Sequence, residues 1–196
     1  MRAPITEADV ETLDLSTPDP QQAAGRLLAW AEDPHPDDAV SPRELLVLAG
    51  EQLELAGDTA GAEDLYRRAA SAAGHASIDP RSHLVALLLD RGERDEALTL
   101  DRELRRSRPA DAATYEYMGE VWSAHGEDGR ALGWVTRGIG VHEQGPGFSQ
   151  TDLAMLCLKR WEVRERQGQE PDGYDVVGIG MRERLDRAQE EHPPVD

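Results

Sequence analysis

Residues 41–71 read SPRELLVLAGEQLELAGDTAGAEDLYRRAAS and contain two helical patterns that meet at Gly57. Before this glycine, apolar and small residues recur every three or four positions, which places them on one face of a helix. After it, Ala62 and Leu65 begin a second face of the same kind. Gly57 supplies a left-handed turn that ends the first helix, and Asp58 can cap the second. We therefore expect a helical hairpin.

This hairpin pattern recurs along the chain. Its marker is a glycine followed by an acidic residue, and it stands at Gly57-Asp58, Gly92-Glu93 and Gly126-Glu127, with spacings of 35 and 34 residues. An alanine follows each glycine by five residues, and large apolar residues stand four residues before and eight residues after it. A period of this length is typical of stacked helical hairpins, so the expected fold class is all-α.

Residues 43–144 resemble the tetratricopeptide repeat (TPR) family at the positions that the family fills with small, apolar and aromatic residues. The matching residues are Leu46, Gly50, Leu53, Ala62, Tyr66 and Ala69 in the first repeat, Leu84, Leu88, Ala97 and Pro109 in the second, and Tyr115, Met118, Gly119, Trp122 and Ala131 in the third. The second repeat departs from the pattern at Arg81, Val85 and Asp101. The resemblance implies a right-handed α-solenoid of TPR-like hairpins with flanking, capping helices.

The flanking segments complete the expected domain organisation. Residues 1–15 are acidic and are predicted to form a disordered arm, and residues 16–40 are predicted to form an N-terminal helix and a loop. Residues 41–145 hold the three TPR-like repeats. Residues 146–192 are predicted to form a divergent fourth helical hairpin that caps the array, since a solenoid needs ends with one polar face. A polar tail follows at residues 192–196.

The composition restricts the class of partner. The chain holds 39 acidic and 21 basic residues, for a net charge of −18, and residues 1–64 alone hold 15 acidic and three basic residues. Such a surface repels phosphate backbones and anionic lipid headgroups, so neither nucleic acid nor a membrane is an expected partner. A single cysteine, Cys157, and the lack of an apolar leader in the first 15 residues predict a cytoplasmic protein.

No motif in the sequence predicts catalysis. The six histidines are scattered, without the helical spacing of a metal-binding pair, and are expected to lie on the surface or in loops. Gly138 and Gly140 belong to no dinucleotide fingerprint and are interpreted as close-packing or helix-end positions. The expectation is therefore a protein that is not an enzyme, with no catalytic residues, no cofactor and no metal.

The resemblance also implies where a partner would bind. In TPR proteins the concave groove is lined by first-helix positions, which here are Glu44, Val47, Glu51 and Glu54 in the first repeat and Glu116 and Glu120 in the third. The lysine, arginine and asparagine with which chaperone-binding TPRs hold an acidic peptide terminus are missing from these positions. An acidic groove favours a protein or peptide partner with a basic or amphipathic segment. The alternative is that these glutamates are simply a solvated surface.

Other readings of the sequence stay open. The C-terminal hairpin could carry an unrecognised enzymatic or regulatory site, and the acidic N-terminal half could mimic nucleic acid. Lys159, Arg160, Arg164 and Arg166 form a basic strip. It could bind within the molecule, join a second copy or meet an acidic partner, but ordinary pairing along one helix is favoured. The sequence leaves the oligomeric state open.

Overall fold

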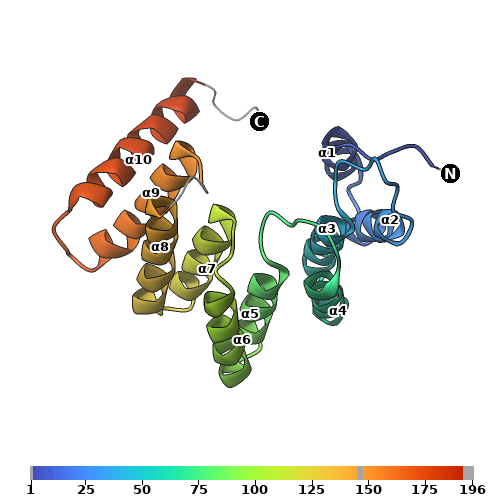
Figure 1. Cartoon of the computed structure of the whole chain (residues 1–196), viewed down its shortest axis with the longest axis horizontal. Coiled ribbons are helices and arrows are strands. Elements are labelled where there is room, and N and C mark those ends of the chain that lie inside the picture. The colour runs from blue at the N-terminus through green and yellow to red at the C-terminus, as the bar shows by residue number, and fades with distance from the viewer. Residues whose placement is uncertain (1, 145–147, 192–196) are drawn as a thin grey trace. The chain divides into compact units, whose positions relative to one another are not determined.

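The computed structural model describes residues 2–144 and 148–191, and the regular elements in this part of the chain are ten α-helices (Figure 1). They are α1 (Glu7–Ser16), α2 (Pro20–Glu32), α3 (Pro42–Leu55), α4 (Thr59–Ser71), α5 (Pro80–Asp90), α6 (Arg94–Ser107), α7 (Ala112–Ala124), α8 (Asp128–Glu143), α9 (Gln150–Arg166) and α10 (Gly173–Glu191). The all-α prediction is confirmed. The predicted break at residues 145–147 and the polar tail at 192–196 lie outside the described residues.

The chain divides into two compact units, unit 1 (Met1–Arg106) and unit 2 (Ser107–Asp196). In unit 1, α3 packs against both α2 and α4, and α4 packs against α5. In unit 2, α8 packs against α7 and α9, and α9 packs against α10. These pairs of helices are consecutive in the chain, as expected of stacked hairpins, and the right-handed superhelix stays a prediction.

Three glycine turns explain the sequence period. Gly57, Gly92 and Gly126 have φ angles of +80°, +76° and +74°, so the predicted left-handed turn is confirmed. In each turn the acidic residue that follows the glycine donates its N–H to the carbonyl of the large apolar residue that stands four positions before the glycine. These bonds join Asp58 to Leu53, Glu93 to Leu88 and Glu127 to Trp122, each at 2.8 Å. This bond closes the end of the helix, so both positions recur with the glycine.

The N-terminal segment differs from its prediction. Residues 1–15 were expected to be a disordered arm, and this is wrong because residues 7–16 form α1. Thr6 and Asp9 make a reciprocal capping box at its start: the Thr6 hydroxyl accepts from the Asp9 N–H, and the Asp9 carboxylate accepts from the Thr6 N–H at 2.8 Å. A cap of this kind satisfies backbone donors that the first turn of a helix otherwise leaves without partners.

Contacts with the loop after α2 hold this segment in place. The Arg2 guanidinium donates to the Asp38 carboxylate at 2.8 Å, and this bond holds the Asp38 pKa well below its usual range. The Ala39 N–H donates to the Ile5 carbonyl at 2.8 Å, and the side chains of Ile5 and Leu13 are buried in the core of unit 1. The prediction of a disordered arm considered the acidic composition of this segment and gave no weight to Ile5 and Leu13, which anchor it to the core.

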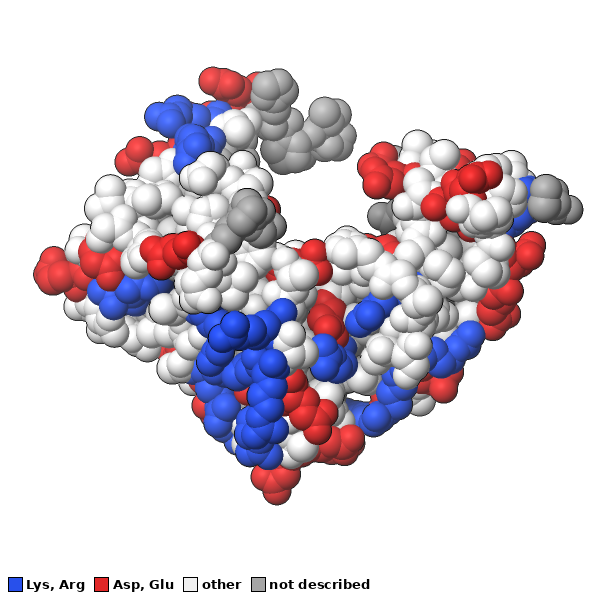
Figure 2. Space-filling model, viewed as in Figure 1, with Lys and Arg blue, Asp and Glu red and all other residues white. Residues whose placement is uncertain are grey.

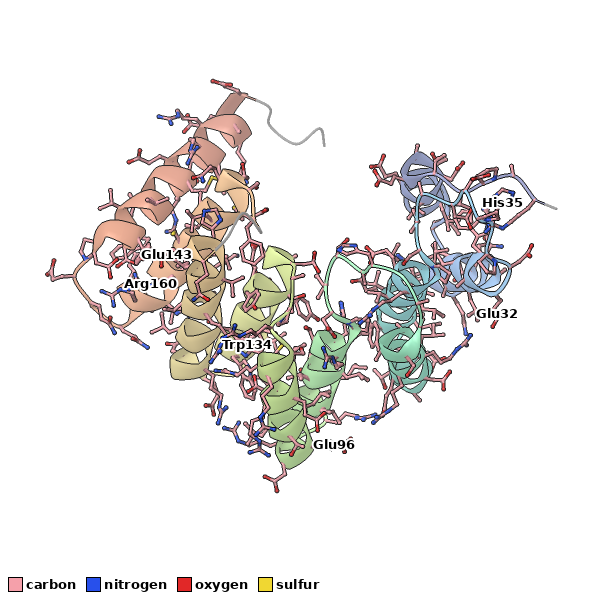
Figure 3. All side chains as sticks on the ribbon, viewed as in Figure 1. Glu32, His35, Glu96, Trp134, Glu143 and Arg160 are labelled. Atoms are coloured by element: carbon pink, nitrogen blue, oxygen red, sulfur yellow. The ribbon has the colours of Figure 1, made fainter. Side chains whose placement is uncertain are left out.

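A buried carboxylate on α10 links this helix to α9 in the C-terminal hairpin. Asp175, near the start of α10, is fully buried and receives hydrogen bonds from Arg160 and from Arg164 Nε, the latter at 2.8 Å. Arg160 also donates to Asp172 at 2.6 Å and points from α9 toward the start of α10 (Figure 3). The favoured pairing along one helix is therefore not what the structure shows for these two arginines, because both bind residues from the next helix and the loop before it.

A glycine lets α10 approach α9 closely. A Cβ atom added at Gly178 would lie 2.5 Å from the Cys157 carbonyl oxygen, whereas one added at Gly180 would meet no heavy atom within 4 Å. We expect Gly178→Ala to lower the free energy of unfolding by about 2 kcal/mol, because a backbone carbonyl cannot rotate away. Gly180→Ala is expected to raise it by about 0.5–1 kcal/mol, since alanine favours the helix. Urea unfolding of the full chain measures both changes, and shifts in the same direction would contradict the close packing.

Candidate functional site

Two of the glutamates predicted to line the groove on α3 bind neighbours within unit 1. The Glu44 carboxylate accepts from the Ser77 N–H at 2.9 Å and from the Ser77 hydroxyl at 2.8 Å. The Glu54 carboxylate accepts from the Tyr66 hydroxyl on α4. Burial raises the pKa of Glu54, and the hydrogen bond from Tyr66 partly opposes this increase. The Glu54 side chain therefore links α3 to α4, and the Glu44 side chain links α3 to the segment before α5.

Val47 was predicted to line the groove, and this is wrong because its side chain is only 3% exposed. It belongs to the apolar core of unit 1, together with Leu45, Leu84 and Leu87. Because α3 packs against both α2 and α4, its buried face is wider than one helix contact requires. Val47 therefore packs in the core under the exposed side of α3 and is not part of the exposed surface.

Glu51, the third predicted glutamate of α3, lies beside a histidine that was expected on the surface or in a loop. Glu51 Oε1 is 3.8 Å from His83 Nε2, and the His83 ring stacks on the Tyr66 ring with 4.7 Å between centroids. His83 is almost fully buried, and burial lowers its pKa to about 4 although the Asp79 carboxylate opposes this. The residues next to a histidine in the sequence do not indicate whether it is buried, because burial depends on the helices that pack around it.

The two predicted residues on α7 belong to unit 2 and face a lysine on α9. Lys159 Nζ lies 2.6 Å from Glu120 Oε1 and 3.8 Å from Glu162 Oε2. Burial raises the pKa of Glu116, an effect that Lys159 opposes and that the neighbouring carboxylates strengthen. This end of the predicted acidic surface therefore contains its own cation, which reduces its attraction for a basic partner.

Unit 1 contains a groove that the sequence analysis did not predict in this form. Two pockets of about 340 Å³ and 230 Å³ share Val10, Glu11 and Leu48 among their lining residues, so they adjoin. We call this surface the α1–α3 groove. Its other lining residues include Glu7, Val40, Glu44, Leu13, Leu27 and Glu51. The groove thus contains two of the predicted glutamates, and α1 contributes one of its sides.

The α1–α3 groove combines an apolar floor with acidic edges. Val10 and Leu48 are partly buried hydrophobic residues that pack on the core of unit 1. Glu7 and Glu11, one turn apart on α1, are exposed, and neither forms an ion pair with any residue that the structure describes. Figure 2 shows acidic side chains on the visible surface of these N-terminal helices. Unit 1 as a whole holds 22 acidic and 11 basic residues, so few cations compete for this surface.

One local signal could have predicted the α1 side of the groove. Thr6 and Asp9 stand three residues apart, which is the spacing of a capping box, and Val10 and Leu13 follow at helical spacing. Glu7 and Glu11 flank Val10 at the border of this apolar face, and both are exposed. That the helix lies beside α3 depends on contacts between distant residues, which no local pattern indicates.

Comparison with protein-family models, with curated proteins and with solved structures finds no match to this chain. Within residues 2–144 and 148–191, no three histidine, cysteine, aspartate or glutamate side chains are grouped so as to hold a metal ion. In the same residues, no helix has both the length and the apolar character needed to cross a membrane. The α1–α3 groove is therefore the candidate functional site.

Proposed function

We propose that this chain is a non-catalytic, TPR-like interaction scaffold and that the α1–α3 groove binds a basic, amphipathic segment of a partner protein. The observation that carries the proposal is the apolar floor of Val10 and Leu48 beside the exposed carboxylates of Glu7 and Glu11. An amphipathic helix or strand presents the complementary pattern, with apolar side chains toward the floor and lysine or arginine toward the edges. The proposal extends the predicted acidic groove to include α1.

The charges on the two sides of the groove have different roles. Glu7 and Glu11 are exposed carboxylates and are available to a basic side chain. Glu44, on the α3 side, already accepts two hydrogen bonds from Ser77 and adds its negative charge to the local field. Complementary fields of this kind increase the rate of encounter and select the sign of the partner's charge, whereas apolar burial supplies most of the affinity.

The proposal is tested with a fluorescent 18-residue peptide in which leucines repeat at helical spacing and lysines fill the other positions. We expect saturable binding to the full chain, with an affinity that falls as salt is added. Glu7→Gln together with Glu11→Gln should weaken binding about fivefold at low salt and reduce its salt dependence, because two exposed attractions of about 0.5 kcal/mol each are lost. Fluorescence anisotropy measures both effects.

A matched control keeps the total charge change constant. Glu183→Gln with Asp186→Asn removes two exposed carboxylates from α10, far from the groove in sequence and outside its lining residues. This control should bind the peptide within twofold of the unchanged protein. Equal weakening in both double variants would indicate attraction to the net charge alone and would overturn the assignment of the groove. A peptide that fails to bind the unchanged protein at low salt would do the same.

A further inference from the structure

A second pocket, of about 510 Å³, lies along α8 in unit 2. We call it the α8 pocket; its lining residues are Leu132, Gly133, Thr136, Arg137, Gly140, Val141 and Gln144 from α8 and the segment that follows it, and Arg108 from the segment before α7. Most of the α8 positions recur at intervals of three and four residues, which places them along one side of the helix. The volume is in the range of sites that bind small molecules.

Arg108 lies at this pocket in an unusual backbone conformation. Its φ of +50° is the single positive value for a residue other than glycine in the described part of the chain. The next residue is Pro109, whose carbonyl accepts a hydrogen bond of 3.0 Å from the buried Tyr115 hydroxyl. A left-handed conformation is unfavourable for arginine and persists only where the surroundings impose it. The buried bond from α7 provides such a constraint, and it holds Arg108 at the edge of the α8 pocket.

The two arginines of this pocket stand apart from others in unit 2. Arg160, Arg164 and Arg166 all form ion pairs with aspartates. Arg108 and Arg137 are exposed, and no carboxylate of the described residues lies within ion-pair distance of either. Arg184 and Arg187 on α10 likewise form no ion pair with a described residue, so what distinguishes Arg108 and Arg137 is that both line the same pocket.

Both guanidinium groups act on one neighbouring residue. Burial raises the pKa of Tyr115, and the charges of Arg137 and Arg108 both oppose that increase. The two cations are therefore close enough to the same phenol to influence it together. Gly140 leaves open space at the wall of the pocket, since a Cβ atom there would meet no heavy atom within 4 Å. Of the two roles predicted for these glycines, close packing applies to Gly138, which lies against Tyr115, whereas Gly140 stands in the last turn of α8.

We propose that the α8 pocket binds a small anionic molecule through a phosphate or carboxylate group held by Arg108 and Arg137. Guanidinium groups bind both anions through paired N–H donors, which gives geometric selectivity as well as charge. Leu132 and Val141 offer apolar contact to the body of such a ligand, and Thr136 and Gln144 offer polar groups. The site is independent of the α1–α3 groove, so the failure of one proposal leaves the other in place.

The experiment titrates the full chain with phenyl phosphate, with benzoate and with the uncharged benzyl alcohol, and follows backbone amide shifts by NMR. We expect saturable binding of phenyl phosphate at about millimolar concentration, the scale for a ligand of this size, with shifts concentrated at residues 132–144. Benzyl alcohol should not saturate. Binding of phenyl phosphate alone would identify a phosphate site, and similar binding of benzoate would identify a carboxylate site; either result supports the proposal.

Paired variants separate this pocket from general attraction to arginine. Arg108→Gln with Arg137→Gln should weaken binding at least tenfold, whereas Arg184→Gln with Arg187→Gln, the same charge change on α10, should leave it within twofold. Gly140→Leu fills the pocket without a change of charge and should also weaken binding at least tenfold. The proposal would be overturned by equal loss in both arginine double variants, or by a failure of both phenyl phosphate and benzoate to saturate the unchanged protein.

Discussion

Replacement of Asp175 by asparagine is expected to lower the free energy of unfolding of unit 2 by about 3 kcal/mol. The fully buried carboxylate receives hydrogen bonds from Arg160 and Arg164 and also from the backbone N–H of Asp172 at 3.0 Å. An asparagine has the same shape but no charge, so both arginines lose the ionic bond to this position. Arg160 keeps Asp172 at 2.6 Å, whereas Arg164 keeps the same carboxylate only at 3.8 Å. The arginines are partly exposed, which places the loss at the lower end of the range for a buried pair.

Cys157 provides a local measurement of this loss. It lies on α9, its thiol is buried, and burial raises its pKa to about 11, so it is expected to react slowly with thiol reagents in the folded protein. A loss of 3 kcal/mol should increase the rate of Cys157 labelling roughly a hundredfold, if labelling follows the open population. Asp186→Asn, at an exposed position of α10, should leave the rate within twofold. Similar labelling rates for the two variants would contradict a structural role for Asp175.

Acidification is expected to destabilise unit 1 through His83. The pKa of this buried side chain is about 4 in the folded protein, against an ordinary value of 6.5. Between these values the unfolded chain binds a proton that the folded chain rejects, so stability is fully present above about pH 6.5 and falls as the pH decreases toward 4. The difference amounts to about 3 kcal/mol once both states are protonated. Glu51 and Asp79 are the carboxylates near this ring, and Tyr66 covers one of its faces.

Comparison with His83→Gln isolates this contribution from other acid-sensitive groups. The variant has no titrating ring, while Glu54, whose pKa burial raises, is present in both proteins. From pH 7 to pH 4, the wild-type protein should lose about 3 kcal/mol more stability than the variant. Native-state hydrogen exchange of the α4 and α5 amides, corrected for the intrinsic effect of pH on exchange, measures the difference. Parallel pH dependences in the two proteins would show that His83 is protonated without cost.

The predicted groove residues show what helical spacing within one repeat can and cannot predict. Glu44 and Glu51 were placed on the accessible side of α3, and both line the α1–α3 groove. Val47 was assigned to the same surface, but it is buried because α3 has neighbours on two sides. Glu120 was interpreted as an attraction for a basic partner, yet it pairs with Lys159 from another helix. Such pairing joins residues distant in sequence, so the spacing within one repeat could not indicate it.

The sequence alone established the hairpins. The ends of α3, α5 and α7 each depend on a left-handed glycine and on a bond between residues five positions apart, as between Asp58 and Leu53, so the information is local and repeats with the period. The tertiary structure was needed to show which charges are already neutralised and which are available. Asp175 and Glu7 are both carboxylates on helices, but one is fully buried between arginines and the other is exposed at a groove. Burial and pairing depend on which helices meet, and that is a property of the whole packed unit.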